Sequence, residues 1–253
     1  MNVVCVFAHQ DDEMRCLGTL QRLAEAGHSI SFVCVTNGNK GLPFEQAGSS
    51  EQRDNSERAA QVREAEMRTV AGHFGGSYES LGYDDGVLFD GPELRNELIA
   101  VLRRLDAELV FTHWTSEYND DHVVTAKAVT DAALFTNLPS FVPQTPPLAR
   151  VPRIFYVNPG DGYGFEATHF VALSDLHVQR KAELIRCHAS QMEVMRQLRG
   201  HDYADEMADE DRRQGARLMV AAAESFRPCL AERRIGWPSD LPGELPDETV
   251  NPA

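Results

Sequence analysis

A cluster of side chains that could bind a metal or transfer a proton follows the first apolar run of the chain. Residues 3–7 are apolar, and His9, Asp11, Asp12 and Glu13 come directly after them. Three neighbouring carboxylates repel one another unless a cation or a shared proton lies between them. If residues 3–7 form a strand of an open α/β sheet, the cluster lies at its carboxyl end, where such sheets bind their ligands. The residue types therefore indicate a metal site with nitrogen and oxygen ligands and a spare carboxylate for base catalysis.

A second group of this kind is EYNDDH at residues 117–122, between a short apolar run and an expected helix. The carboxyl ends of parallel strands meet at one edge of a sheet, so the two groups are expected to lie together. His9, Asp12 and His122 could then form a set of two imidazoles and one carboxylate with an open position for water. This is the donor set of a catalytic zinc site.

Both groups also have a simpler explanation, because acids and amides at the start of a helix accept hydrogen bonds from its first N–H groups. Asp12 and Glu13 could cap the first helix in this way, and Asn119, Asp120 or Asp121 could cap the later one. A capping residue in either group does not exclude a metal ligand beside it.

The motifs taken together resemble those of the LmbE/PIG-L family of zinc-dependent N-deacetylases. AHQDDE at 8–13 is similar to the AHPDDE motif of that family, and NDDH at 119–122 lies where the family has H-x-D-H. The resemblance extends over about residues 1–192. Shorter segments agree in the same order: TNG at 36–38, R-x-x-E at 63–66, LGYDDG at 81–86 and KAELIRCHASQ at 181–191.

This resemblance implies a Rossmann-like fold, a bound zinc ion or another divalent metal, and hydrolysis of an acyl amide, often on an N-acetylglucosamine unit. It implies His9, Asp12 and His122 as metal ligands and Asp11 as the general base. Arg63 matches a position that contacts substrate or an active-site acid, although a surface salt bridge would equally explain an arginine there.

Asn119 and Asp121 complete the catalytic residues that we assign from the resemblance, and Asn119 departs from the family pattern, as does Gln10. Gln10 replaces a proline, which leaves the ligand spacing intact. Asn119 replaces a histidine that stabilises the oxyanion or relays a proton, and an asparagine can donate a hydrogen bond but cannot transfer a proton. Either Asp11 performs both proton transfers, or His113 or another group substitutes, or the substrate is atypical.

The elements that must position these residues alternate between strands and helices, which predicts one three-layer α/β/α domain with a mostly parallel sheet. This single LmbE-like domain is expected over residues 1–235, followed by a poorly ordered tail rich in proline and acids over 236–253. Residues 37–55 are expected to form a mobile rim or lid, and 137–152 an irregular connector. Strands are predicted at 2–8, 29–36, 77–81, 108–112, 153–157 and 169–173, and helices at 13–27, 55–74, 92–105, 121–135, 174–188, 189–198 and 203–226.

Composition narrows the class of protein. The chain has 253 residues with a formal net charge of −15, which argues against nucleic acid or an anionic membrane as a partner. Its five cysteines match no disulfide or zinc-ribbon spacing, and no apolar stretch reaches the length of a membrane span. These features predict a cytoplasmic protein with free thiols and no membrane insertion.

The sequence thus predicts a zinc-dependent amidohydrolase that removes an N-acyl group, most simply acetyl, from a small molecule that contains an amino sugar. His188, Ser190 and Gln191 are interpreted as supporting residues. Two alternatives remain open: an amidase that acts on a larger amide conjugate, and a catalytically degenerate binding module on the same fold. The sequence leaves a homo-oligomer possible.

Overall fold

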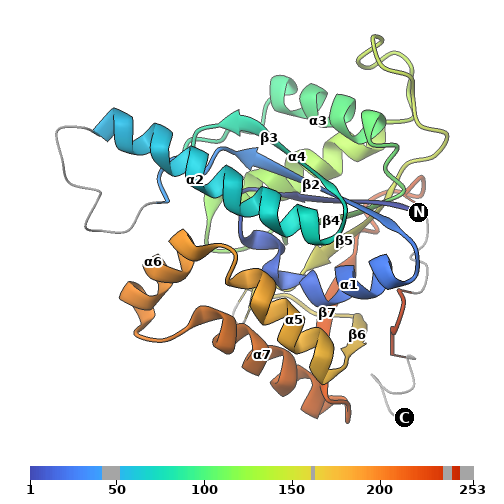
Figure 1. Cartoon of the computed structure of the whole chain (residues 1–253). Helices are drawn as coiled ribbons and strands as arrows, with labels where there is room; N and C mark the ends of the chain where they lie inside the picture. The colour runs from blue at the N-terminus through green and yellow to red at the C-terminus, as the bar shows by residue number, and fades with distance from the viewer. Residues whose placement is uncertain (42–51, 161–162, 236–240, 246–253) are drawn as a thin grey trace.

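The computed structural model describes residues 1–41, 52–160, 163–235 and 241–245 of the chain. Within them, strands pair into one mixed sheet of seven strands with the order β3-β2-β1-β4-β5-β7-β6 (Figure 1). The five strands from β3 to β5 run parallel, and β7 is antiparallel to both of its neighbours. The predicted α/β fold with a mostly parallel sheet is therefore confirmed. The strands are β1 (Asn2–Phe7), β2 (Ser29–Thr36), β3 (Ser77–Tyr83), β4 (Leu109–Thr112), β5 (Arg153–Val157), β6 (His169–Leu173) and β7 (Ala222–Pro228).

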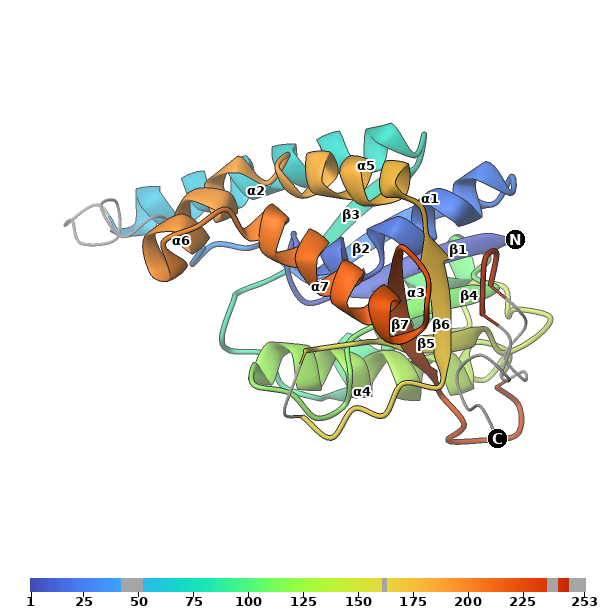
Figure 2. The ribbon, with the colours of Figure 1, turned by 90° about the horizontal axis from the view of Figure 1, so that it is seen from below.

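Helices cover both faces of this sheet, as the view from below makes plain (Figure 2). α3 (Pro92–Arg104) and α4 (Asp120–Phe135) pack on one face. On the other face lie α1 (Leu17–Glu25), α2 (Gln52–His73), α5 (Asp175–Ile185) and α7 (Tyr203–Arg217), with α6 (Ala189–Arg199) beside α7 and α2. No helix of the described residues is long and apolar enough to cross a membrane.

The continuous apolar run of β1 is explained by burial on both faces of the sheet. Val3, Cys5 and Phe7 enter the core under α1 and α5, whereas Val4 and Val6 enter the core under α3 and α4. Side chains alternate between the two faces along a strand, so one sequence of apolar residues serves both cores. The sharp change to polar residues after Phe7 then marks the place where the chain leaves the core at the edge of the sheet.

The predicted helix at 203–226 is confirmed as far as Arg217 and is wrong beyond it. α7 ends at Arg217, and Ala222–Pro228 form β7, which inserts between β5 and β6. Good helix formers fill this segment, but the unpaired edges of the two flanking strands gain a full set of hydrogen bonds from a strand there. Gly215 makes the reversal possible, since a Cβ atom at this position would lie 2.4 Å from the Cα atom of Ala222.

Residues 241–245, which fall within the predicted tail, lie against β6, and the poor order of the tail stays a prediction. The amide N–H of Ala172 donates to the carbonyl of Gly243, and that of Leu245 donates to the carbonyl of Phe170. Leu241 is buried in the core. The rest of residues 236–253 and most of the predicted lid lie outside the described residues.

A buried charge network joins the antiparallel part of the sheet to the first helix. The Lys181 ammonium of α5 lies 2.8 Å from carboxylate oxygens of both Asp211 and Glu224. Glu224 also accepts hydrogen bonds from the backbone N–H groups of Gly18 and Thr19 at the start of α1. Burial opposes the charged ammonium, but the two carboxylates together raise the pKa of Lys181 above its ordinary value. The first helix is thereby held by a residue of the last strand.

We expect Lys181→Met to lower the free energy of unfolding by about 3–5 kcal/mol, because it leaves two buried acids without a counter-charge. Lys127→Met is the matched control, since Lys127 also pairs with two acids but its side chain is 56% exposed. That exposed pair should contribute no more than about 1 kcal/mol. Urea denaturation measures both values, and equal losses for the two variants would contradict a structural role of the buried network.

Candidate metal centre

The two motifs meet because their strands are neighbours in the sheet. His9 follows β1, and His122 lies in the first turn of α4, which follows β4. β1 and β4 pair in parallel, with Val3 opposite Leu109, so both chains leave the sheet at the same edge. The predicted approach of residues more than a hundred positions apart is thus confirmed.

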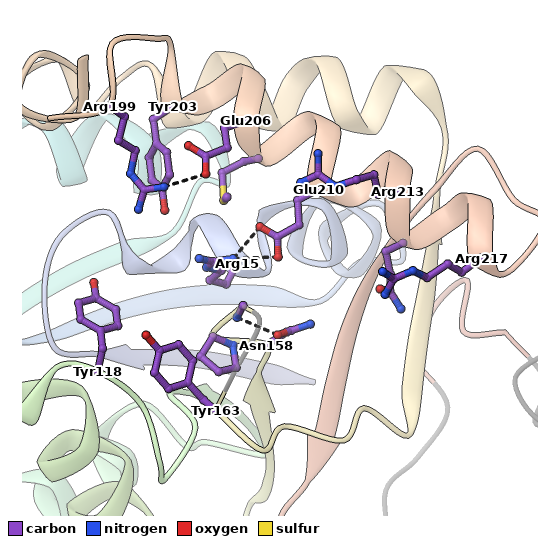
Figure 3. Close-up of a pocket in the computed structure, with 14 residues that line it drawn as sticks. Arg15, Tyr118, Asn158, Tyr163, Arg199, Tyr203, Glu206, Glu210, Arg213 and Arg217 are labelled. Atoms are coloured by element: carbon purple, nitrogen blue, oxygen red, sulfur yellow. Dashed lines mark hydrogen bonds and ion pairs between the residues drawn. The ribbon is translucent and has the colours of Figure 1, made fainter. Parts of the chain in front are cut away.

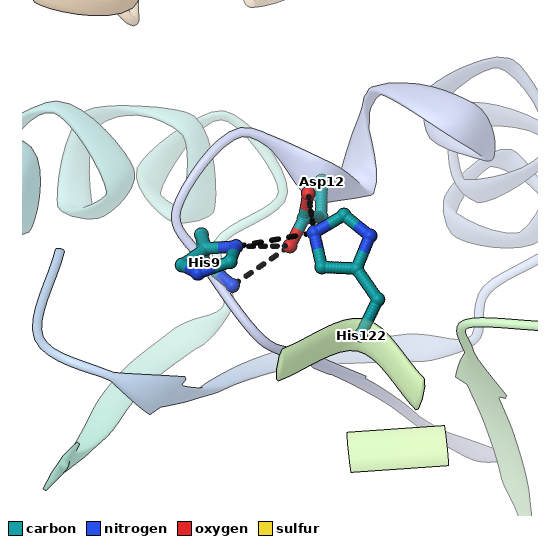
Figure 4. Close-up of side chains that lie close together, drawn as sticks. All are labelled: His9, Asp12 and His122. Atoms are coloured by element: carbon teal, nitrogen blue, oxygen red, sulfur yellow. Dashed lines mark hydrogen bonds and ion pairs between the residues drawn. The ribbon is translucent and has the colours of Figure 1, made fainter. Parts of the chain in front are cut away.

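His9, Asp12 and His122 form a compact triangle of donor atoms (Figure 4). His9 Nδ1 lies 3.1 Å from His122 Nε2 and 3.4 Å from Asp12 Oδ2, and His122 Nε2 lies 3.3 Å from Asp12 Oδ1. Two donors that bind one tetrahedral zinc ion at about 2.0–2.1 Å stand about 3.3 Å apart. The spacing of these three side chains therefore fits a single zinc ion.

Each histidine of the triangle is oriented by an acid on its far side. His9 Nε2 lies 3.1 Å from Asp121 Oδ2, and His122 Nδ1 lies 2.6 Å from Glu117 Oε2. Asp121 is itself fixed by a hydrogen bond of 2.6 Å from the backbone N–H of Gly86. Paired carboxylates of this kind orient metal-ligating histidines and raise their basicity.

The electrostatics of the triangle also suit a cation. Although burial disfavours the charged form, hydrogen bonds with Asp12 and Asp121 raise the pKa of His9 to about 9. Burial likewise opposes the charge on His122, but Asp12 and Glu117 raise its pKa to about 10. The acids thus draw positive charge into the site as protons, and a divalent cation on the same donor atoms would replace those protons.

Asp11 stands beside the triangle in a strained conformation. Its φ angle is 122°, which side-chain-bearing residues rarely adopt, and such strain persists only where surrounding contacts enforce it. Arg63 of α2 enforces it by donating a hydrogen bond of 2.8 Å to Asp11 Oδ1 and another to the carbonyl of Gln10. Burial raises the pKa of Asp11 to about 6, while the Arg63 guanidinium counteracts that rise.

These contacts exclude two of the simpler explanations, helix capping by the acids after β1 and a surface salt bridge for Arg63. The acids after β1 do not cap the short 3-10 helix η1 (Asp12–Arg15) with their side chains; Asp12 accepts a hydrogen bond from the His9 N–H, and Glu13 one from the Asp11 N–H. Arg63 is 4% exposed, so the surface salt bridge is wrong as an explanation of this residue.

Asn119 does cap its helix. Its Oδ1 accepts a hydrogen bond of 2.9 Å from the backbone N–H of Asp121 at the start of α4. The catalytic roles assigned to Asn119 and Asp121 stay predictions. Asp121 lies on the far side of the His9 ring from the triangle and contacts its Nε2.

A small pocket of about 60 Å³ opens onto the triangle. Asp11, Asp12 and His122 line it together with His113, Tyr118 and Arg15, among others. His113 packs face to face on His122 with ring centroids 3.9 Å apart, and its Nε2 accepts a hydrogen bond of 2.9 Å from the Ala8 N–H, so its substitution for the family histidine stays a prediction. Among the described residues, neither Asn119 nor Asp121 lines this pocket.

Sequence reasoning missed Glu117, Tyr118 and Arg15 as site residues. Glu117 belongs to the segment that was singled out, but its contact with two histidines depends on how the turn before α4 folds back. Tyr118 is 69% exposed and places its ring edge-on to His122 at 5.6 Å. A tyrosine or arginine outside a motif carries no signal of its own.

The residues interpreted as supporting ones, His188, Ser190 and Gln191, contact residues of other segments. His188 Nε2 lies 2.6 Å from Glu13 Oε1 in a fully buried pair. Ser190 donates hydrogen bonds from both its N–H and its hydroxyl to Glu66, and the Gln191 amide donates to the Gly41 carbonyl. The contacts of Ser190 and Gln191 tie the first turn of α6 to α2 and to the segment after β2.

The α/β fold places two imidazoles, one carboxylate and the adjacent Asp11 at the carboxyl edge of a parallel sheet, a donor arrangement typical of metal-dependent hydrolases. The family model described as PIG-L, GlcNAc-PI de-N-acetylase, matches residues 4–133, just over half of the chain. The chain belongs to this family, and the resemblance noted in its motifs is confirmed.

Solved structures share the whole fold. N,N'-diacetylchitobiose deacetylase from Pyrococcus horikoshii is 23% identical with a TM-score of 0.74, over 90% of this chain and 83% of that one. The conserved protein TT1542 from Thermus thermophilus is 25% identical with a TM-score of 0.72, over 95% and 100%. GalB, the 4-carboxy-2-hydroxymuconate hydratase from Pseudomonas putida, is 18% identical with a TM-score of 0.77, over 92% and 98%. A comparison with curated proteins found no match.

A substitution at Gly38 tests how tightly the backbone of this residue packs against the Arg63 side chain. Its φ is +74°, and a Cβ atom there would lie 2.4 Å from Gln10 Oε1 and 2.7 Å from Arg63 Cδ. We expect Gly38→Ala to lower the free energy of unfolding by more than about 1 kcal/mol, because both the backbone and the space exclude a methyl group.

Gly72→Ala is the control, since a Cβ atom at this helical position meets nothing within 4 Å. It should be neutral or stabilise the protein by up to about 1 kcal/mol. Chemical denaturation compares the two variants, and tolerance of both would show that Arg63 moves freely.

Proposed function

We propose that this protein is a zinc-dependent N-deacetylase that removes an acetyl group from a small molecule containing an amino sugar. The observation that carries the proposal is the triangle of His9, Asp12 and His122, two of whose members, Asp12 and His122, line one pocket with Asp11. Family membership supports the reaction type, since the family model is described as a de-N-acetylase. The neighbour that acts on diacetylchitobiose supports an N-acetylated sugar as the substrate.

His9, Asp12 and His122 would hold the metal, and Asp121 and Glu117 would keep the two imidazoles in the required orientation. When bound, zinc supplies a Lewis acid that polarises an amide carbonyl and lowers the pKa of water to roughly 7.

Asp11 accepts the proton of the attacking water at its carboxylate and returns it to the leaving amine nitrogen. Arg63 keeps the Asp11 carboxyl group in place through the hydrogen bond to Oδ1. A direct contact between Arg63 and substrate stays a prediction, as does an oxyanion contact from Asn119. His113 offers a second imidazole on the pocket wall.

The fold alone does not select this reaction, because unrelated chemistries recur on one fold. One structural neighbour is named as a hydratase. An amidase for larger conjugates and a binding module without turnover are the other candidates. The donor set and family membership favour deacetylation, and an acetate assay separates these outcomes.

We expect the zinc-loaded protein to release acetate from N-acetylglucosaminyl glycosides and to lose this activity on chelation. Asp11→Asn should retain about one zinc per chain yet lower kcat by about 10²–10⁴-fold, because the amide cannot accept the proton. Metal analysis and acetate release by mass spectrometry measure both effects. Near-normal turnover of Asp11→Asn would remove Asp11 as the base, and no metal under replete conditions would favour the binding module.

The orienting role of Asp121 has its own test. Asp121→Asn should weaken zinc binding about 10–100-fold, because the amide no longer fixes His9 as a carboxylate does. Asp120→Asn is the matched control, since Asp120 is the adjacent, exposed acid of the same helix turn. Competition with a chromogenic chelator measures both affinities, and a similar change in the two variants would refute the role.

A further inference from the structure

A second and larger pocket adjoins the metal centre. It has a volume of about 470 Å³ and runs along α7 (Figure 3). Arg15, Tyr118, Pro159 and Tyr203 line both this pocket and the small one over the triangle. A substrate whose sugar lies at the metal centre would therefore extend its remaining part into this space. We call it the α7 pocket.

The α7 pocket is basic in a strongly acidic protein. Four arginines and two glutamates line it, which is a formal charge of +2, whereas the whole chain carries −15. Two of the arginines are neutralised: Arg15 pairs with Glu210 at 3.0 Å, and Arg199 pairs with Glu206 at 2.8 Å. The excess charge therefore comes from the other two, Arg213 and Arg217.

Arg213 and Arg217 form no ion pair with any described residue and project from α7 along the pocket in Figure 3. They stand four positions apart on one helix, a spacing at which like charges destabilise the helix. Their neighbour Arg212 lies outside the pocket and pairs with Asp209. In a chain with an excess of acids, two unpaired arginines side by side along one pocket indicate a site for an anionic group.

The opposite wall carries aromatic rings. Tyr118 and Tyr163 lie with ring centroids 6.2 Å apart across the pocket from α7. On the α7 side of the pocket, the guanidinium carbon of Arg199 lies 5.0 Å from the ring centroid of Tyr203, and this stacking fixes the guanidinium there. Such a surface suits an organic chain or ring that leads from the sugar towards the arginines.

We propose that the α7 pocket binds the aglycone of the substrate and that this aglycone ends in an anionic group, a carboxylate or a phosphate, held by Arg213 and Arg217. This assignment of substrate class rests on the proposed deacetylase function. An α-helix rises about 1.5 Å per residue, so Arg213 lies about 15 Å along α7 from Tyr203. The aglycone must accordingly be several bonds long. Planar guanidinium groups are well suited to either oxyanion.

The experiment uses matched glycosides of N-acetylglucosamine on the zinc-loaded full chain. The first carries a 6-carboxyhexyl aglycone, the second its neutral 6-carbamoylhexyl counterpart, and the third a 6-phosphohexyl aglycone. The readout is the ratio of kcat/KM for each charged glycoside to that for the neutral one. Comparison of the two charged glycosides identifies which oxyanion the pocket prefers.

For the native protein we expect a ratio of at least about tenfold, since hydrogen bonds to charged groups contribute about 1.5–3 kcal/mol. The double substitution Arg213→Gln with Arg217→Gln should bring the ratio close to one, mainly through a higher KM for the charged glycosides. Arg212→Gln, the control, should keep the native ratio. A ratio near one for the native protein would overturn the proposal, as would equal ratios for the double variant and the control.

Failure of the deacetylase function gives a different result from failure of this pocket. If no glycoside releases acetate, calorimetric titration with the same three glycosides still reports binding. Tighter binding of a charged glycoside that depends on Arg213 and Arg217 would support the α7 pocket and refute only the deacetylation. Equal binding of charged and neutral glycosides would refute the pocket.

Discussion

The structure depends on the pairing of buried carboxylates with arginine and histidine side chains at the carboxyl edge of the parallel sheet. A buried charge is costly unless a partner and hydrogen bonds offset the loss of water. Each acid of this edge has such a partner, and the partners come from α2, α4 and the loop before α6, which are far apart in the chain. The pairs are Asp11 with Arg63, Asp12 with His9 and His122, Glu13 with His188, Glu117 with His122, and Asp121 with His9. The site is therefore also what holds these elements in register.

The parallel and the antiparallel parts of the sheet position different pockets. The parallel strands bring the candidate metal triangle and Asp11 together at one edge, and four of these strands, β1 to β4, lie largely within the matched family region, whereas β5 lies outside it. The later elements, with β7 antiparallel between β5 and β6, place α7 beside that edge. Lys181, Asp211 and Glu224 couple the later part to α1, so the wall of the α7 pocket is fixed relative to the metal centre. The proposed catalytic residues and the proposed aglycone pocket thus lie in different segments of the chain.

Net charge and local charge lead to different conclusions about partners. The chain's excess of acids disfavours long polyanions, whose charges would meet the acidic surface over a wide area. A small anion inside a pocket meets only the local field, which Arg213 and Arg217 dominate in the α7 pocket. The negative net charge of the chain is therefore compatible with the anionic aglycone that we propose.

The sequence by itself determined the fold class and indicated that His9, Asp12 and His122 lie together. Periodicity distinguishes buried strands from helices, His9 and Asp12 lie within one local turn, and the rule that parallel strands end at a common edge adds His122. The sequence could not determine β7, because the backbone hydrogen bonds that β7 forms with β5 and β6 outweigh the local helix propensity of its residues. It could not separate the roles of Asn119, Asp121 and Glu117, because a rotation of one helix turn decides which of them faces a histidine. The α7 pocket was equally out of reach, since Arg15 and the arginines of α7 are about two hundred positions apart and meet only through the packing of helices on the sheet.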